Sequence, residues 1–129
     1  MIHESIAVPG MKSLGPYSQA VQANGFVFVS GQPGIYPASG IAGQSFEEQA
    51  RQAFRNLETV LRAADSGMSL VVNTTISVAD MNEFAVVNQL FLEYFPEKPP
   101  ARMTQQVTLP KGLLISIGCV ALMAQPSTP

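Results

Sequence analysis

Arg102 is the residue whose place in the sequence most strongly suggests chemistry. Between Arg102 and the last residue, Pro129, the only other charged side chain is Lys111. A guanidinium stays protonated and presents a rigid fork of N–H donors that matches a carboxylate or a phosphate. Because a buried cation without an anion is costly, two interpretations are equally open. Arg102 either pairs with a carboxylate of the chain itself or binds a small anionic ligand.

The single histidine and the single cysteine limit the other kinds of site. His3 lies close to the N-terminus, so neither a Ser-His-Asp triad nor a histidine-rich metal site is expected. Cys119 cannot form an internal disulfide, which fits a reducing compartment. Cys119 also follows the alternation of Ile115 and Ile117, and we interpret it as a core residue.

The composition favours one apolar domain over residues 1–129 that assembles with other copies. Only 12% of the residues are charged, against about 25% in average domains, while 47% are hydrophobic. A net charge of −2 gives no basic footprint for nucleic acid, and no apolar run is long enough to span a membrane. The N-terminus lacks the pattern of a signal peptide. We therefore expect a soluble, cytoplasmic oligomer without nucleic-acid or membrane partners.

A first helix is predicted over residues 45–64. Ser45 and Glu48 have the spacing of a capping box. Gly67 is expected to end the helix by adopting the left-handed backbone conformation. Pairs of opposite charge at i,i+4 are expected on its wet side: Glu47–Arg51 and Glu58–Arg62.

A second helix is predicted from Asp80 to just before Pro96, with Glu83 completing a similar capping box. Asn88 falls on or beside its apolar face. A buried amide needs partners, and the pattern favours a bond from Asn88 to neighbouring backbone over a ligand contact. The apolar face itself carries Phe84, Val87, Phe91 and Phe95.

The remaining periodic segments predict strands in a single sheet. A hairpin turn is expected at Asn24-Gly25, and residues 31–43 read as a loop. The strands are expected over residues 21–23, 26–30, 70–78, 103–109 and 113–123. This order predicts an α/β fold whose two helices cover one face of the sheet. The strands lack a polar face, so the second face should be covered by other subunits, with any site near that interface.

Four segments in this order resemble the Rid (YjgF-type) family of reactive intermediate/imine deaminases. They are Gly15–Ala20, Val29–Gln32, Thr74–Asn88 and Pro100–Lys111. The resemblance implies a chorismate-mutase-like α/β fold and a homotrimer with three clefts between subunits. It also implies hydrolysis of 2-imino acids such as 2-iminopropanoate and 2-iminobutanoate to 2-oxo acids and ammonia. No cofactor and no metal are implied.

The same resemblance implies roles for individual residues. Arg102 would hold the substrate carboxylate, and the backbone amide of Gly31 would bond that carboxylate or the reacting nitrogen. The other residues of the cleft would be Tyr17, Ser30 and Asn88. Thr104 is the nearest counterpart of a cysteine that the family carries shortly after its arginine.

Two departures from the family pattern leave the activity open. Ser116 stands where active deaminases carry a glutamate thought to position or activate water, and a hydroxyl is a poor base near neutral pH. The spacing from Arg102 to Leu109 is also one residue shorter than expected, and a one-residue slip exchanges the faces of a strand. The chain is then either a weak or altered deaminase using Arg102 and Ser116, or a non-catalytic trimeric binder of small carboxylates. A third hypothesis is RNA cleavage, an activity that has been assigned to some relatives, and it is the least favoured of the three.

Overall fold

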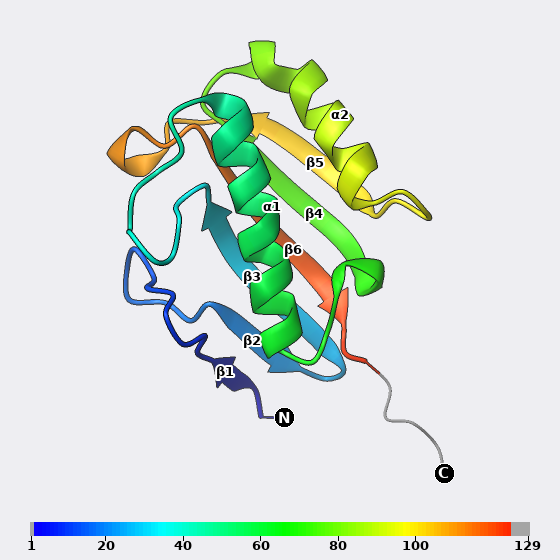
Figure 1. Ribbon diagram of the computed structural model, residues 1–129. Helices are drawn as coiled ribbons and strands as arrows, with labels where there is room; N and C mark the ends of the chain where they lie inside the picture. Colours follow the sequence, from blue (N-terminus) through cyan, green and yellow to red (C-terminus); the bar gives the residue numbers. More distant parts are fainter. Residues whose placement is uncertain (1, 125–129) are drawn as a thin grey trace.

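Within residues 2–124, which the computed structural model describes, six strands form one mixed sheet and two α-helices lie on the same face of it (Figure 1). The strands are β1 (Glu4–Ile6), β2 (Ala20–Ala23), β3 (Phe26–Pro33), β4 (Val71–Val78), β5 (Ala101–Gln106) and β6 (Ile115–Leu122). Their order across the sheet is β1-β2-β3-β6-β4-β5. The β4–β5 pair is parallel and the others are antiparallel. The predicted α/β fold is confirmed, and β1 is an addition too short to show periodicity.

Helix α1 (Phe46–Ala63) packs on β3 and β6, and its start follows the predicted cap only in part. Ser45 Oγ accepts a hydrogen bond from the backbone N–H of Glu48 at 3.1 Å. The Glu48 carboxylate does not return to Ser45, because it accepts a bond from the Tyr36 hydroxyl at 2.8 Å instead. One half of the capping box therefore forms, and the other half ties the helix to the loop after β3.

The predicted stop of α1 at Gly67 is wrong. Asp65 adopts the left-handed conformation, with φ of 59°, whereas Gly67 is extended, with φ of −175°. The backbone N–H of Ser66 donates to Leu61 O, which closes the final turn. Aspartate tolerates this conformation better than most residues because of its short polar side chain.

Helix α2 (Phe84–Tyr94) begins later than predicted, after a short 3₁₀ turn at Met81–Glu83. The Asp80 carboxylate caps that turn by accepting from Asn82 N at 2.9 Å, so it does not form a box with Glu83. The helix still ends before Pro96, as expected.

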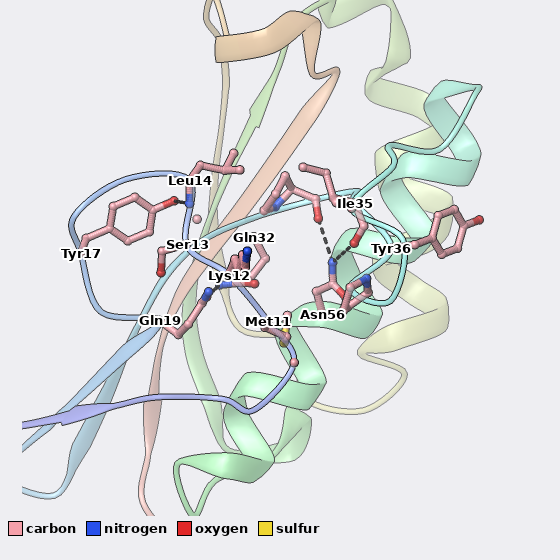
Figure 2. Close-up of a pocket in the computed structure, with 15 residues that line it drawn as sticks. Met11, Lys12, Ser13, Leu14, Tyr17, Gln19, Gln32, Ile35, Tyr36 and Asn56 are labelled. Carbon is pink, nitrogen blue, oxygen red and sulfur yellow. Dashed lines mark hydrogen bonds between the residues drawn. The ribbon is translucent and has the colours of Figure 1, made fainter.

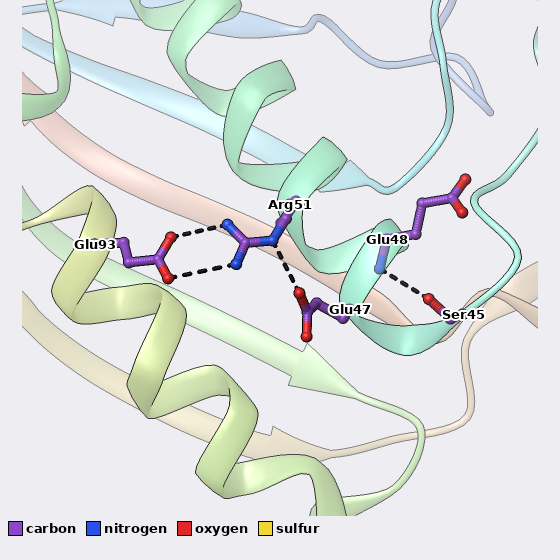
Figure 3. Close-up of polar contacts among 5 residues, drawn as sticks. All are labelled: Ser45, Glu47, Glu48, Arg51 and Glu93. Carbon is purple, nitrogen blue, oxygen red and sulfur yellow. Dashed lines mark hydrogen bonds and ion pairs between the residues drawn. The ribbon is translucent and has the colours of Figure 1, made fainter.

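Arg51 ties the two helices together (Figure 3). Its guanidinium bonds Glu47 on α1 at 3.1 Å and Glu93 on α2 at 2.8 Å. Hydrogen bonds from Arg51 lower the pKa of the Glu93 carboxyl. The predicted Glu47–Arg51 pair is confirmed, as is Glu58–Arg62 at 3.2 Å. The link to Glu93 fixes α2, which carries Asn88, against α1.

The core lies between the helices and the sheet. It contains buried side chains of α1 and α2 together with the helix-facing residues of β3, β4 and β6. Cys119 belongs to this core, as predicted, and burial raises the pKa of its thiol to about 12. Cys119 therefore remains a neutral thiol near pH 7. No helix within residues 2–124 is long and apolar enough to cross a membrane.

The outer face of the sheet is mixed, which corrects the prediction that the strands lack a polar face. It exposes large apolar side chains, namely Phe26, Phe28, Val72, Met103 and Leu122. Polar residues lie among and beside them, namely Asn73, Thr75, Ser77 and Ser116. The apolar part of this face is left without a cover in the single chain.

Strand β3 is irregular where the sequence predicted a loop. The hairpin from β2 turns through Asn24 and Gly25, with φ of 54° and 82°, as expected. Further along β3, Ser30 and Gly31 lie opposite the single residue Gly118 of β6. This β-bulge prolongs the strand to Pro33 and turns Gln32 toward the helices.

Candidate functional site

The Arg102 side chain lies on the helix side of β5, against α2. Its Nη2 donates to Asn88 Oδ1 at 2.6 Å, and its Cζ is 5.3 Å from the ring centroid of Phe84 and 4.9 Å from that of Phe91. Partial burial lowers the pKa of the guanidinium from its ordinary value. Arg102 forms no ion pair within residues 2–124. Of the two sequence interpretations, the described structure favours a guanidinium available to an external anion.

Asn88 has a different partner from the one expected. It is exposed rather than buried, and it bonds a side chain rather than the neighbouring backbone. The sequence also did not single out Phe84 and Phe91 as parts of the site. Their spacing around Asn88 was a usable signal, because residues at i, i+4 and i+7 share one helix face.

Replacing Asn88 by alanine should weaken carboxylate binding about tenfold, because Arg102 would lose the bond that orients it. Isothermal titration with propanoate measures this change. Gln89→Ala, at the neighbouring exposed position of α2, is the matched control and should bind as wild type does. Equal affinity of Asn88→Ala and wild type would show that the two aromatic rings alone hold Arg102.

Thr104 follows Arg102 by two residues and lies on the same side of β5. Its hydroxyl oxygen is enclosed and has no hydrogen-bond partner within the described residues. β5 pairs with β4 over residues 101–106 without a register shift, and Val107 N continues the pairing to Val78 O. The pairing of β5 is therefore continuous from Ala101 to Gln106, with no bulge in that range.

A second group of predicted residues lies around the bulge of β3. The Ser30 hydroxyl donates to Ser18 O at 2.6 Å, which joins the bulge to the chain before β2. The Tyr17 ring is exposed, and its hydroxyl accepts from Leu14 N at 3.2 Å. The Ser30 bond fixes the segment that precedes β2 against the end of β3, and the Tyr17 bond lies within that segment.

Gly31 and Ser116 lie side by side in this group. A Cβ atom at residue 31 would collide with Ser116 Oγ, so the hydroxyl lies directly beside the glycine backbone. The two residues border a hollow of about 360 Å³ on the outer face of the sheet. Ser77 and Thr75 of β4 line the same hollow. This arrangement can hold a water molecule between hydroxyl groups and the bulge.

The two groups do not meet within one chain. The pairing runs from Arg102 to Thr74, from Thr74 to Cys119 and from Cys119 to Val29, so Arg102 is three strands from the bulge. At about 4.8 Å per strand, this separation is roughly 14 Å. Arg102 also faces the helices, whereas Ser116 faces the opposite side. The predicted cleft is therefore incomplete in the single chain.

Comparison with known proteins identifies the family. The family model described as endoribonuclease L-PSP matches residues 9–123. The chain belongs to the Rid (YjgF-type) family.

Named relatives and solved structures of the Rid family agree with this assignment. The mouse protein named 2-iminobutanoate/2-iminopropanoate deaminase is 42% identical over 112 residues, which cover 85% of this chain and 83% of that protein. Chloroplastic Reactive Intermediate Deaminase A of Arabidopsis thaliana is 43% identical over 113 residues, covering 86% of this chain and 60% of that protein. The crystal structure of RidA from Psychrobacter is 34% identical, with a TM-score of 0.90 over 93% of this chain and 99% of that one.

Proposed function

We propose that this Rid-family chain hydrolyses 2-imino acids to 2-oxo acids and ammonia in clefts between the subunits of a homotrimer. Arg102 and Asn88 of one subunit would face Tyr17, Gly31 and Ser116 of the next. The observation that carries the proposal is the separation of these two groups onto different strands and opposite faces. The names of the mouse and Arabidopsis relatives supply the reaction class.

The exposed apolar part of the outer sheet face supports the assembly. Phe28 is 46% exposed and Met103 is 61% exposed in the single chain. Exposed apolar side chains concentrated on one sheet face are typical of a surface that another protein covers. A second copy of the chain would bury them and bring a second set of site residues nearby.

The proposed chemistry needs one water molecule and no redox step. Arg102 binds the carboxylate through charged hydrogen bonds and so places the C=N bond over the bulge. Water adds to the imine carbon, a proton passes to nitrogen, and the carbinolamine loses ammonia to leave a 2-oxo acid. The Ser116 hydroxyl can orient the water by a hydrogen bond but is a weak base. Most of the rate enhancement would therefore come from orientation.

A coupled assay tests this function. A threonine dehydratase generates 2-iminobutanoate while semicarbazide competes for the imine, and the formation of 2-oxobutanoate is followed. Added wild-type protein should accelerate 2-oxobutanoate formation and reduce semicarbazone formation. If a folded, assembled protein leaves both rates unchanged, the deaminase proposal fails.

The second candidate is a non-catalytic trimeric binder of small carboxylates. It is favoured by Ser116, which places a hydroxyl where the family resemblance implies a carboxylate base. Propanoate binding without any acceleration in the coupled assay would select this candidate. RNA cleavage, which the family description names, is not proposed, because nine acidic residues outnumber seven basic ones in the chain.

A further inference from the structure

A cavity within the chain lies next to the bulge but on the other side of Gly31 from the Ser116 hollow. It has a volume of about 330 Å³ and is bounded by the segment before β2, the loop after β3 and helix α1 (Figure 2). Its walls include apolar side chains such as Met11, Leu14 and Ile35. A volume of this size can hold a small ligand or part of one.

Two glutamine side chains form the polar part of this cavity. Gln19 is 7% exposed and Gln32 is 2% exposed. Gln32 Nε2 donates to Ser30 O and to Gln19 Oε1, both at 3.0 Å. A backbone carbonyl can only accept, so the atom of Gln32 that faces Ser30 O must be the nitrogen. This contact also requires the oxygen of Gln19 to face Gln32.

The orientation leaves one acceptor and one donor uncommitted. Both N–H groups of Gln32 are used, while Gln32 Oε1 and Gln19 Nε2 have no hydrogen-bond partner within residues 2–124. Neither atom is among the fully enclosed, unpartnered atoms of the described chain, so each retains accessible surface. Because both residues line the cavity, that surface is available to a molecule inside it.

The other polar groups of the cavity have different roles. Asn56 has no free donor, since its Nδ2 donates to Pro33 O and Ile35 O, and its Oδ1 accepts from Gln52. Lys12 contributes the one charged side chain among the described lining residues. The cavity therefore offers apolar walls, the exposed Lys12, the side chain of Ser13 and one free donor–acceptor pair on Gln19 and Gln32.

We propose that this cavity is the side-chain subsite of the cleft and that it selects ligands with an apolar stem and a terminal carboxamide. This inference rests on the proposed function, because Arg102 of the neighbouring subunit would hold the carboxylate at the other end. Gly31 lines both the cavity and the Ser116 hollow, and Tyr17 also lines the cavity, so the cavity adjoins two residues of the proposed cleft.

The chemistry of the two free atoms discriminates among terminal groups. A carboxamide accepts from Gln19 Nε2 and donates to Gln32 Oε1. A carboxylate would place an oxygen against Gln32 Oε1, and an alkyl group would leave both atoms unpaired. The carboxamide should therefore bind about tenfold more tightly than the alkyl group.

Calorimetric titration of the assembled protein tests this with stable probes. The probes are monoamides of dicarboxylic acids with two, three and four methylene groups, each compared with its diacid and its methyl-branched alkyl isostere. Propanoate, which carries no terminal amide or second carboxylate, reports on the binding of the carboxylate alone. The quantity measured is the affinity ratio of monoamide to isostere within each variant.

Gln19→Glu is the informative variant, because it keeps the oxygen that Gln32 needs and replaces the free donor by a second oxygen. Gln44→Glu adds the same charge at an exposed position outside the cavity and is the matched control. We expect a ratio of about ten for the best chain length in wild type and Gln44→Glu, and about one in Gln19→Glu.

Propanoate binding without a carboxamide preference at any chain length overturns this inference and leaves the proposed function intact. A preference that survives in Gln19→Glu overturns it as well. If a folded protein binds neither propanoate nor the longer probes, the proposed binding of a carboxylate by Arg102 is wrong, and the proposed subsite is wrong with it.

Discussion

Arg102→Ala should bind propanoate at least about 100-fold more weakly than wild type and should no longer accelerate imine hydrolysis. A bidentate contact between a guanidinium and a carboxylate supplies two charged hydrogen bonds, each contributing about 1.5–3 kcal/mol. Calorimetry measures the affinity, and the coupled assay measures the hydrolysis. Because Arg102 forms no ion pair within the described residues, its removal should leave the fold unchanged.

The matched control for this change is Lys111→Ala, which removes the other positive charge of the C-terminal segment from an exposed position. Lys111→Ala should bind propanoate as wild type does. Loss of assembly in Arg102→Ala, seen by light scattering, would assign Arg102 a structural role. Unchanged propanoate binding by an assembled Arg102→Ala would remove it from the site.

Ser116→Glu should raise the rate of imine hydrolysis about 100-fold over wild type. A general base typically contributes about 10²–10⁴-fold, and the serine hydroxyl cannot supply that proton transfer near neutral pH. Residue 116 faces the hollow beside Gly31, which has room for a longer side chain. The initial rate in the coupled assay measures the gain.

Ser116→Gln distinguishes the effect of a general base from the effect of side-chain size. Glutamine has the same length as glutamate but no ionisable group. Only the glutamate variant should gain activity. If both variants are folded and neither exceeds wild type, then the hollow around Gly31 does not host the attacking water.

The local features of the fold could be predicted wherever a short sequence signal decides them. Ser45 caps α1 and Asn24-Gly25 forms the hairpin turn because each depends on only a few neighbouring residues. The stop at Asp65 was missed because a residue other than glycine took the left-handed position. The bulge at Ser30 and Gly31 was missed because it depends on pairing with β6, which lies far along the sequence.

The candidate site could be predicted as a set of residues but not as an arrangement. Family motifs point to Arg102 and Gly31, yet they do not reveal that β6 and β4 lie between them. The bond from Arg102 to Asn88 and the Gln19–Gln32 pair likewise depend on tertiary contacts. The order of the strands and the direction of the side chains depend on the folded chain, and they keep the two groups of site residues apart within one chain.

A subunit-mixing experiment tests most directly the claim that each cleft is completed by two chains. Arg102→Ala removes the carboxylate grip, and Gly31→Leu fills the space beside Ser116, so neither variant alone should retain a propanoate site. Equal amounts are mixed, dissociated and reassembled, and the binding sites per chain are counted by titration. In a closed ring with random mixing, about a quarter of the clefts receive an intact half from each variant. Recovery of about a quarter of the wild-type sites is the predicted result, and no recovery in confirmed mixed assemblies would contradict the account.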